Sequence, residues 1–181
     1  MSNTIIGGNL TAAITGGVYY LTALARTTEG SEQLLTSPAT ILRAYIVNIL
    51  ATMNLPSTKR VWPLYVSHLP DGNNVRTDAG VVYDTSGLND PRQMNGFVPQ
   101  HFGVQFRIRA KDYDAGWTKI EDIATDLDAV NNVSIIVDSV EYELHNISRT
   151  SPILALGIEP GTKRRYGFTV NFIMTISNLT S

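Results

Sequence analysis

The sequence predicts one α+β domain, a mostly antiparallel mixed sheet of roughly six strands with two main helices packed on one face. Three observations lead to this class. Apolar and polar residues alternate from Phe102 to Lys111, as in a half-buried strand. The apolar spacing changes to three or four between Trp117 and Val130, as on one face of a helix. The later strands are joined by connections too short for crossovers, which favours antiparallel pairing.

The stretch Phe102–Val130 is the unit around which the other elements are arranged. Its strand has one apolar face, made of Phe102, Val104, Phe106, Ile108 and Ala110. Its other face is polar, with Gln105, Arg107, Arg109 and Lys111. Asp114 is the predicted N-cap of the helix that follows, because a carboxylate there accepts hydrogen bonds from the first turn.

An earlier helix is expected to begin at Ser37-Pro38, with serine as the N-cap and proline in the first turn. Its apolar positions run from Ile41 to Met53, and Leu55-Pro56 ends it because the residue before a proline avoids the helical conformation. This helix has a single charge, so we expect it to be covered on most sides.

The remaining apolar runs are interpreted as strands. A short one is predicted over residues 61–67. Residues 133–137 and 140–144 are predicted to form a hairpin around Asp138-Ser139. Another strand covers 153–158, before a strong turn at Glu159–Thr162. Residues 166–176 show the longest alternation in the chain, and we expect this strand to be central.

The predicted domain spans residues 37–181, preceded by an N-terminal arm over residues 1–36. The arm is either a frayed terminus or a segment that crosses to a neighbouring subunit. Residues 68–100 are predicted to form an extended loop or flap, too long for a passive connection in a compact domain. A disordered surface insertion is the alternative to a hairpin that contacts an assembly partner.

Composition excludes several classes of protein. The 181 residues suffice for one full core, and 43% hydrophobic content excludes a wholly disordered chain. With 17% charged residues and a net charge of -2, the chain has no electrostatic footprint for nucleic acid and a surface suited to packing against neighbours. There is no cysteine, no apolar run long enough for a membrane span, and no signal-peptide pattern at the start. We expect a protein made and used in a cytoplasm.

No motif predicts an enzyme. The histidines His68, His101 and His145 have no metal-ligand spacing, and phosphate loops and nucleophile elbows are absent from the sequence. Paired carboxylates near the start of the second helix could do acid–base chemistry, but the helix dipole favours acidic residues there, and we prefer this second interpretation. These carboxylates are Asp112, Asp114, Glu121 and Asp122. We therefore expect no catalytic residue, no metal and no cofactor.

Two basic clusters are the candidate contact residues. They are Arg107, Arg109 and Lys111 on the strand, and Lys163, Arg164 and Arg165 at a turn. The first cluster could contact phosphates, lie on a solvated sheet face paired with Glu141 and Glu143, or form salt bridges between subunits. Neither cluster is interleaved with aromatic residues, as a nucleic-acid platform would be.

The second half of the chain resembles the tail terminator proteins of tailed bacteriophages, a group also named minor capsid or tail completion proteins. The matching pieces are Gln105–Ala110, Asp112-Tyr113, Ser151-Pro152, Leu156-Gly157 and Arg165–Phe172. The resemblance extends from Ser37 to Ser177 and is strongest after Phe102. It does not account for residues 1–36 or 68–100.

This resemblance implies a mixed sheet with helices on one face, and a structural virion protein of the tail or neck, assembled in the host cytoplasm. Its partners would be copies of itself in a hexameric ring, the tail tube protein, and the head connector or stopper. The ring would cap the tube, end its polymerisation and join tail to head, while genomic DNA passes through the lumen without specific binding. Both basic clusters would then be intersubunit or lumen-facing charges.

Other classes stay open at this stage. A different neck or head-completion component, or a tail tube subunit, would share the low charge and the strand content, although two well-capped helices disfavour a tube subunit. An enzyme or ligand-binding domain with the same strand–helix order would need a convergent polar pocket, whose residues the sequence does not reveal.

Overall fold

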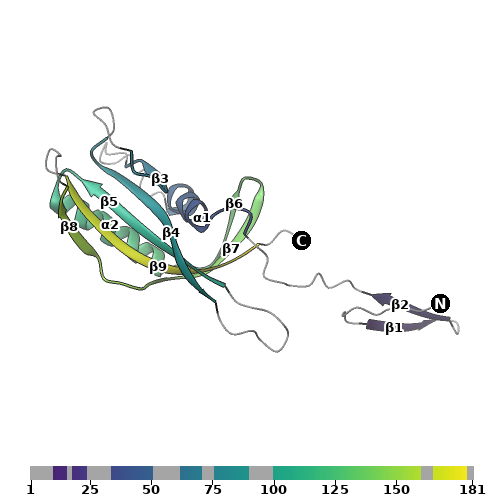
Figure 1. Ribbon diagram of the computed structural model, residues 1–181. Coiled ribbons are helices and arrows are strands. Elements are labelled where there is room, and N and C mark those ends of the chain that lie inside the picture. Colours follow the sequence, from purple (N-terminus) through teal and green to yellow (C-terminus); the bar gives the residue numbers. More distant parts are fainter. Residues whose placement is uncertain are drawn as a thin grey trace.

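The computed structural model describes residues 10–15, 18–23, 34–50, 62–70, 76–89, 100–159 and 165–178. Within them, the main body is a seven-stranded mixed sheet with two α-helices on one side (Figure 1). The predicted α+β class, with mostly antiparallel strands and helices on one face, is therefore confirmed. Along the chain, strands follow one another except where α1 and α2 intervene. Short connections between consecutive strands favour antiparallel pairing.

The strand order in the sheet is β3-β4-β5-β9-β7-β6, and β8 also pairs with β9. The strands are β3 (Leu64–Val66), β4 (Ala79–Asn89), β5 (Gln100–Ala110), β6 (Asn131–Val137), β7 (Val140–Arg149), β8 (Leu154–Ile158) and β9 (Tyr166–Asn178). Every pairing is antiparallel except β3 with β4, which is parallel. β9 is central, as its long alternation predicts, because it pairs with β5 on one edge and with β7 and β8 on the other.

The organising unit is β5 followed by α2 (Tyr113–Asp128). The N-cap is Asp112 and not the predicted Asp114, because the Asp112 carboxylate accepts a hydrogen bond from the Ala115 backbone N at 2.9 Å. α2 packs closely on the sheet at Gly116. A Cβ there would lie 2.5 Å from the Phe168 ring, so a side chain at this position would push the helix away.

The first helix, α1 (Pro38–Tyr45), begins at the predicted cap. The Ser37 side chain accepts from the Thr40 backbone N, and Pro38 follows in the first turn. A π-helical turn, η1 (Ile46–Leu50), continues it, and the rest of the predicted helix lies outside the described residues. Asp84 of β4 accepts from the Ala39 backbone N at 2.8 Å, which ties the helix start to the sheet.

One core lies between the two helices and the sheet. The sheet contributes the even-numbered residues of β5 and the aromatic and aliphatic residues of β9. The helices contribute the apolar stripes of α1 and α2. The fully buried members of the core include Ile41, Leu42, Phe106, Ile108, Ile120, Ile123, Phe168, Val170 and Leu144. Figure 1 shows α2 lying against β5 and β9, the strands that contribute most of the sheet side of the core. The predicted apolar face of β5 is thus the core face.

Residues 68–100, predicted as an extended loop, hairpin or flap, contain β4, which pairs antiparallel with β5, so the alternative of a disordered insertion is wrong for residues 79–89. Residues 79–89 are a full strand of the sheet, and the ladder with β5 runs from the Ala79–Arg109 pair to the Asn89–Gln100 pair. A register shift between Thr85 and Leu88 interrupts it. Val81, Val82 and Tyr83 carry the only strand signal of this segment in the sequence, because the residues that follow, 84–88, are exposed and mostly polar.

A second, separate sheet consists of two strands. β1 (Leu10–Thr15) and β2 (Val18–Ala23) pair as an antiparallel hairpin and share no pairing with the main sheet. They belong to the predicted N-terminal arm of residues 1–36. Most of the remaining arm lies outside the described residues, so its interpretation stays a prediction.

Candidate interaction surface

No described helix covers the sheet face opposite the core. On β5 it holds the odd-numbered positions, and the register places these beside the odd-numbered positions of β9. Gln105, Arg107, Asn171 and Thr175 are each half-buried, so the face is neither a core nor a fully solvated surface. We refer to it as the open face.

Hydrogen-bonded side-chain pairs connect neighbouring strands across the open face. Gln105 Nε2 on β5 donates to Asn171 Oδ1 on β9 at 3.0 Å. His101 Nδ1 and Thr175 Oγ1 lie 2.9 Å apart, which makes a second β5–β9 pair. On the other edge of β9, His145 Nε2 of β7 lies 2.8 Å from Ser177 Oγ. Cross-strand pairs of this kind satisfy polar groups locally and stiffen the sheet.

The basic residues of β5 do not share one environment. Arg109 is 1% exposed and donates to the backbone oxygens of Pro70, Arg76 and Thr77, at 3.2 to 3.3 Å. Its expected role as an intersubunit or lumen-facing charge is therefore wrong. The guanidinium instead holds these three backbone positions against the sheet, because its five donors can serve several carbonyls at once.

Arg107, two residues away, keeps contact with solvent. Its side chain is 32% exposed, and Nη2 forms a salt bridge of 3.1 Å with Glu159 Oε1. The alternative pairing with Glu141 and Glu143 does not form, because β9 lies between β5 and β7. Nε of Arg107 is buried and finds no hydrogen-bond partner among the described residues.

The other predicted contact residues that the structure describes lie where β5 ends and β9 begins. Lys111 is exposed just past the end of β5, and its backbone N donates to Asp78 at 2.8 Å. Arg165 is half-buried, and its backbone oxygen accepts from the Glu159 backbone N at 2.8 Å. Lys163 and Arg164 lie outside the described residues, so their assignment stays a prediction.

β7 and β8 form one interrupted strand along the same edge of β9. β7 pairs with Phe172–Asn178 and β8 with Tyr166–Thr169. At the interruption, the Thr150 backbone N donates to the Asn171 oxygen, and the Ser151 hydroxyl accepts from the Asn171 backbone N at 3.2 Å. The serine hydroxyl thus replaces a strand carbonyl just before Pro152, where the ladder cannot continue.

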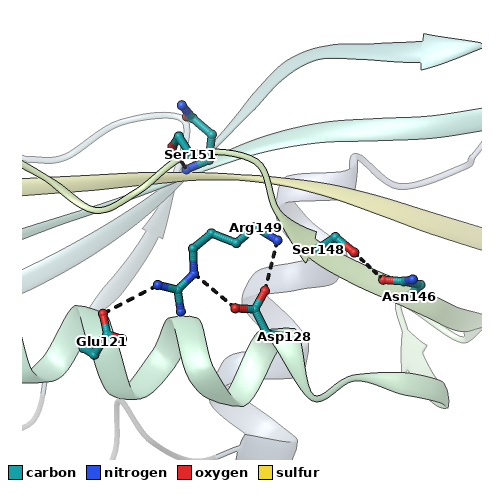
Figure 2. Close-up of polar contacts among 7 residues, drawn as sticks. Glu121, Asp128, Asn146, Ser148, Arg149 and Ser151 are labelled. Atoms are coloured by element: carbon teal, nitrogen blue, oxygen red, sulfur yellow. Dashed lines mark hydrogen bonds and ion pairs between the residues drawn. The ribbon is translucent and has the colours of Figure 1, made fainter.

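The β7 part of this edge is fastened to α2. Figure 2 shows Arg149 extending from the end of β7 to two carboxylates of the helix. Its Nε lies 3.1 Å from Asp128 Oδ2, and its Nη1 lies 3.6 Å from Glu121 Oε2. Asp128 also accepts from the Arg149 backbone N at 3.0 Å, so one carboxylate holds both backbone and side chain.

The β8 part is exposed along its whole length. Leu154 and Leu156 are each 50% exposed and Ile158 is 53% exposed. Leu156 lies beside Gly167 and Arg107 on the open face, and Gly157 has a φ of +81° where the pairing shifts register. These five residues contain no charge and lie at the outer edge of the sheet, and they were not among the predicted contact residues. A uniformly apolar strand ordinarily indicates burial on both faces, so its sequence did not reveal this exposure.

The described residues contain no group of three or more histidine, aspartate or glutamate side chains that could hold a metal ion. Across the same part of the chain, none of the helices has the length and apolar character needed to cross a membrane. No protein-family model matches the sequence, and no curated protein matches it either.

Proposed function

We propose that this chain is a structural subunit of a tailed bacteriophage virion, a tail terminator that assembles as a homo-hexameric ring. The ring caps the tail tube, ends tube polymerisation and presents a surface to the head connector or stopper. The function is carried out by binding surfaces without a chemical reaction, and DNA passes through the lumen without specific contacts.

The observation that carries the proposal is the convergence of the resembling segments on β9. Gln105–Ala110 pairs with Arg165–Phe172 along the β5–β9 ladder. Ser151-Pro152 lies on the opposite edge, where the Ser151 hydroxyl accepts from the Asn171 backbone N. Segments separated by some sixty residues in sequence thus form one continuous part of the sheet, as expected of a shared fold signature.

Two further features support an assembly role. The helices cover one face of the sheet, which is the architecture that the resemblance implies, and the other face is half-buried and polar. The open face and β8 together offer polar and apolar surface in a chain with only 17% charged residues. Surfaces of this composition are typical of contacts between protein subunits.

A density map of the particle that carries this chain tests the proposal. We expect a ring of six copies between the end of the tail tube and the head connector. A location at a capsid vertex, or along the length of the tube, would contradict it and would favour another head-completion component or a tail tube subunit. Tails assembled without the chain should be of unregulated length and should fail to join heads.

A further inference from the structure

Neither strand of the hairpin β1–β2 pairs with a described strand of the main sheet. Its register pairs Leu10 with Ala23, Ala12 with Leu21, and Ile14 with Tyr19. All six of these residues are apolar in type. A lone two-stranded hairpin is marginally stable at best in water, so this one needs a further strand or surface to pack on.

β8 is the complementary element in the main sheet. It pairs with β9 along one edge, and no described strand pairs with its other edge. Natural edge strands usually carry lysine, other charges or proline that block pairing, and Leu154–Ile158 contains none of these. β1 and β2 are likewise free of charged residues. β8 has five residues and each hairpin strand has six, so a hairpin strand is long enough to pair with all of β8.

The attachment point of the hairpin favours a second copy over the chain's own β8. Leu34 packs on the core, and Tyr142 Oη donates to Thr36 Oγ1 at 2.9 Å, beside the Asn178 end of β9. β8 pairs with the opposite end of β9, and the ten residues from Asn178 to Phe168 span about 33 Å. The chain from Leu34 back to Ala23 reaches about 36–40 Å when fully extended. Docking on its own β8 would use almost all of that length.

We infer that the β1–β2 hairpin of one copy adds to the free edge of β8 in a second copy. One hairpin strand continues the sheet beyond β8 by backbone hydrogen bonds, and the exposed leucines of β8 pack against it. The contact is heterologous, because the donor surface differs from the acceptor surface, and contacts of that kind close into rings when the rotation allows. The inference goes beyond the proposed function and does not depend on it, since a ring at any location could use this contact.

Cross-linking of the full chain tests this contact, because the sequence contains no cysteine. One preparation carries Leu154→Cys and the other carries Leu21→Cys, with different mass tags. After mixing and treatment with a short bis-maleimide, we expect a mixed dimer that contains both tags. Ile136→Cys replaces Leu154→Cys in the matched control, because Ile136 is an equally apolar residue on an outer strand and is 68% exposed.

Each outcome decides the inference. A mixed dimer with Leu154→Cys, at least ten times more abundant than with Ile136→Cys, supports it. Equal yields with both acceptors, or none with either, overturn it. A chain carrying both Leu154→Cys and Leu21→Cys that cross-links only within the monomer would show self-docking and would also overturn it. A particle map without a ring between tube and connector would contradict the proposed function but leave the cross-linking result standing.

Discussion

β7 and β8 lie on the same edge of β9 and differ in almost everything else. Alternate residues of β7 are buried, and Tyr142 and Leu144 are fully inaccessible to solvent. Every residue of β8 is exposed, although its composition is the more apolar of the two. The strand with three charged residues is covered, and the strand with none is bare.

The difference comes from the surrounding elements. β7 pairs with β6 on its outer edge. On its core side it packs on α2, and the Arg149–Asp128 ion pair connects the two elements. β8 comes after the Ser151-Pro152 interruption and has no described strand on its outer edge. Apolar composition therefore indicates that a strand will be covered, but the cover can come from another subunit. Substitutions in the two strands should therefore affect the stability of the fold to different extents.

The largest expected effect is in β7. Leu144→Ala removes a side chain that is 0% exposed, and the cavity should lower the free energy of unfolding by about 2–5 kcal/mol. Urea denaturation of the isolated chain measures it. Leu154→Ala in β8 is the matched control and should cost under about 1 kcal/mol, because half of that side chain is already in water. Equal losses in the two variants would remove the contrast between the strands.

A smaller effect is expected at the ion pairs that fasten β7 to α2. Arg149→Ala should lower the free energy of unfolding by about 1 kcal/mol, because Asp128 and Glu121 are both partly exposed and solvent weakens the interaction. A double-mutant cycle with Asp128→Asn isolates the pair. A coupling energy near zero would mean that packing alone positions the end of β7.

A titration reports on the core beneath the sheet. Burial raises the pKa of the Tyr45 hydroxyl above its usual value of 10.0, and the nearby Asp126 carboxylate raises it further. A raised pKa in the folded state contributes stability that is present below the unfolded-state pKa and is lost as the pH rises through the folded-state pKa. Stability should therefore fall above pH 10, and Tyr45→Phe should flatten that part of the profile. Variants in β8 should still lose stability above pH 10. If they did not, β8 would have to support the core around Tyr45.

The smallest effect on stability is expected for charges placed on β8. Leu154→Lys together with Leu156→Lys should change the free energy of unfolding by no more than about 0.5 kcal/mol, since both positions are exposed. The same pair should weaken self-association at least tenfold, measured by sedimentation velocity, because lysine on an edge strand blocks pairing. Ile136→Lys should leave association unchanged. Loss of folding in the double variant, or unchanged association, would contradict the assignment of β8.

The sequence predicted the elements of the main sheet well where the pattern was local. The alternation of Phe102–Ala110 identified β5 and its core face, and Ser37-Pro38 identified the start of α1. Asp138 and Ser139 form the turn of the predicted hairpin with φ values of +50° and +68°, as a tight two-residue turn requires.

The environment of individual residues could not be predicted, because it depends on elements distant in the chain. Arg107 and Arg109 have the same parity on β5, yet only Arg109 donates to the backbone oxygens of Pro70, Arg76 and Thr77. Because β9 lies between β5 and β7, Arg107 pairs with Glu159 and not with a carboxylate of β7. Similarly, β8 was recognised as a strand, but its exposure follows from the absence of a covering element among the described residues.

Amide hydrogen exchange in β8 tests the central claim most directly, namely that this edge is covered by another copy. In dilute full-length protein, the outward-facing amides of Leu154–Ile158 should exchange rapidly while those of β7 stay protected. At concentrations where the chain associates, the β8 amides should become protected, and a variant with Ile14→Asp in the hairpin should lose that protection. Rapid exchange of β8 in the associated wild-type protein would contradict the account.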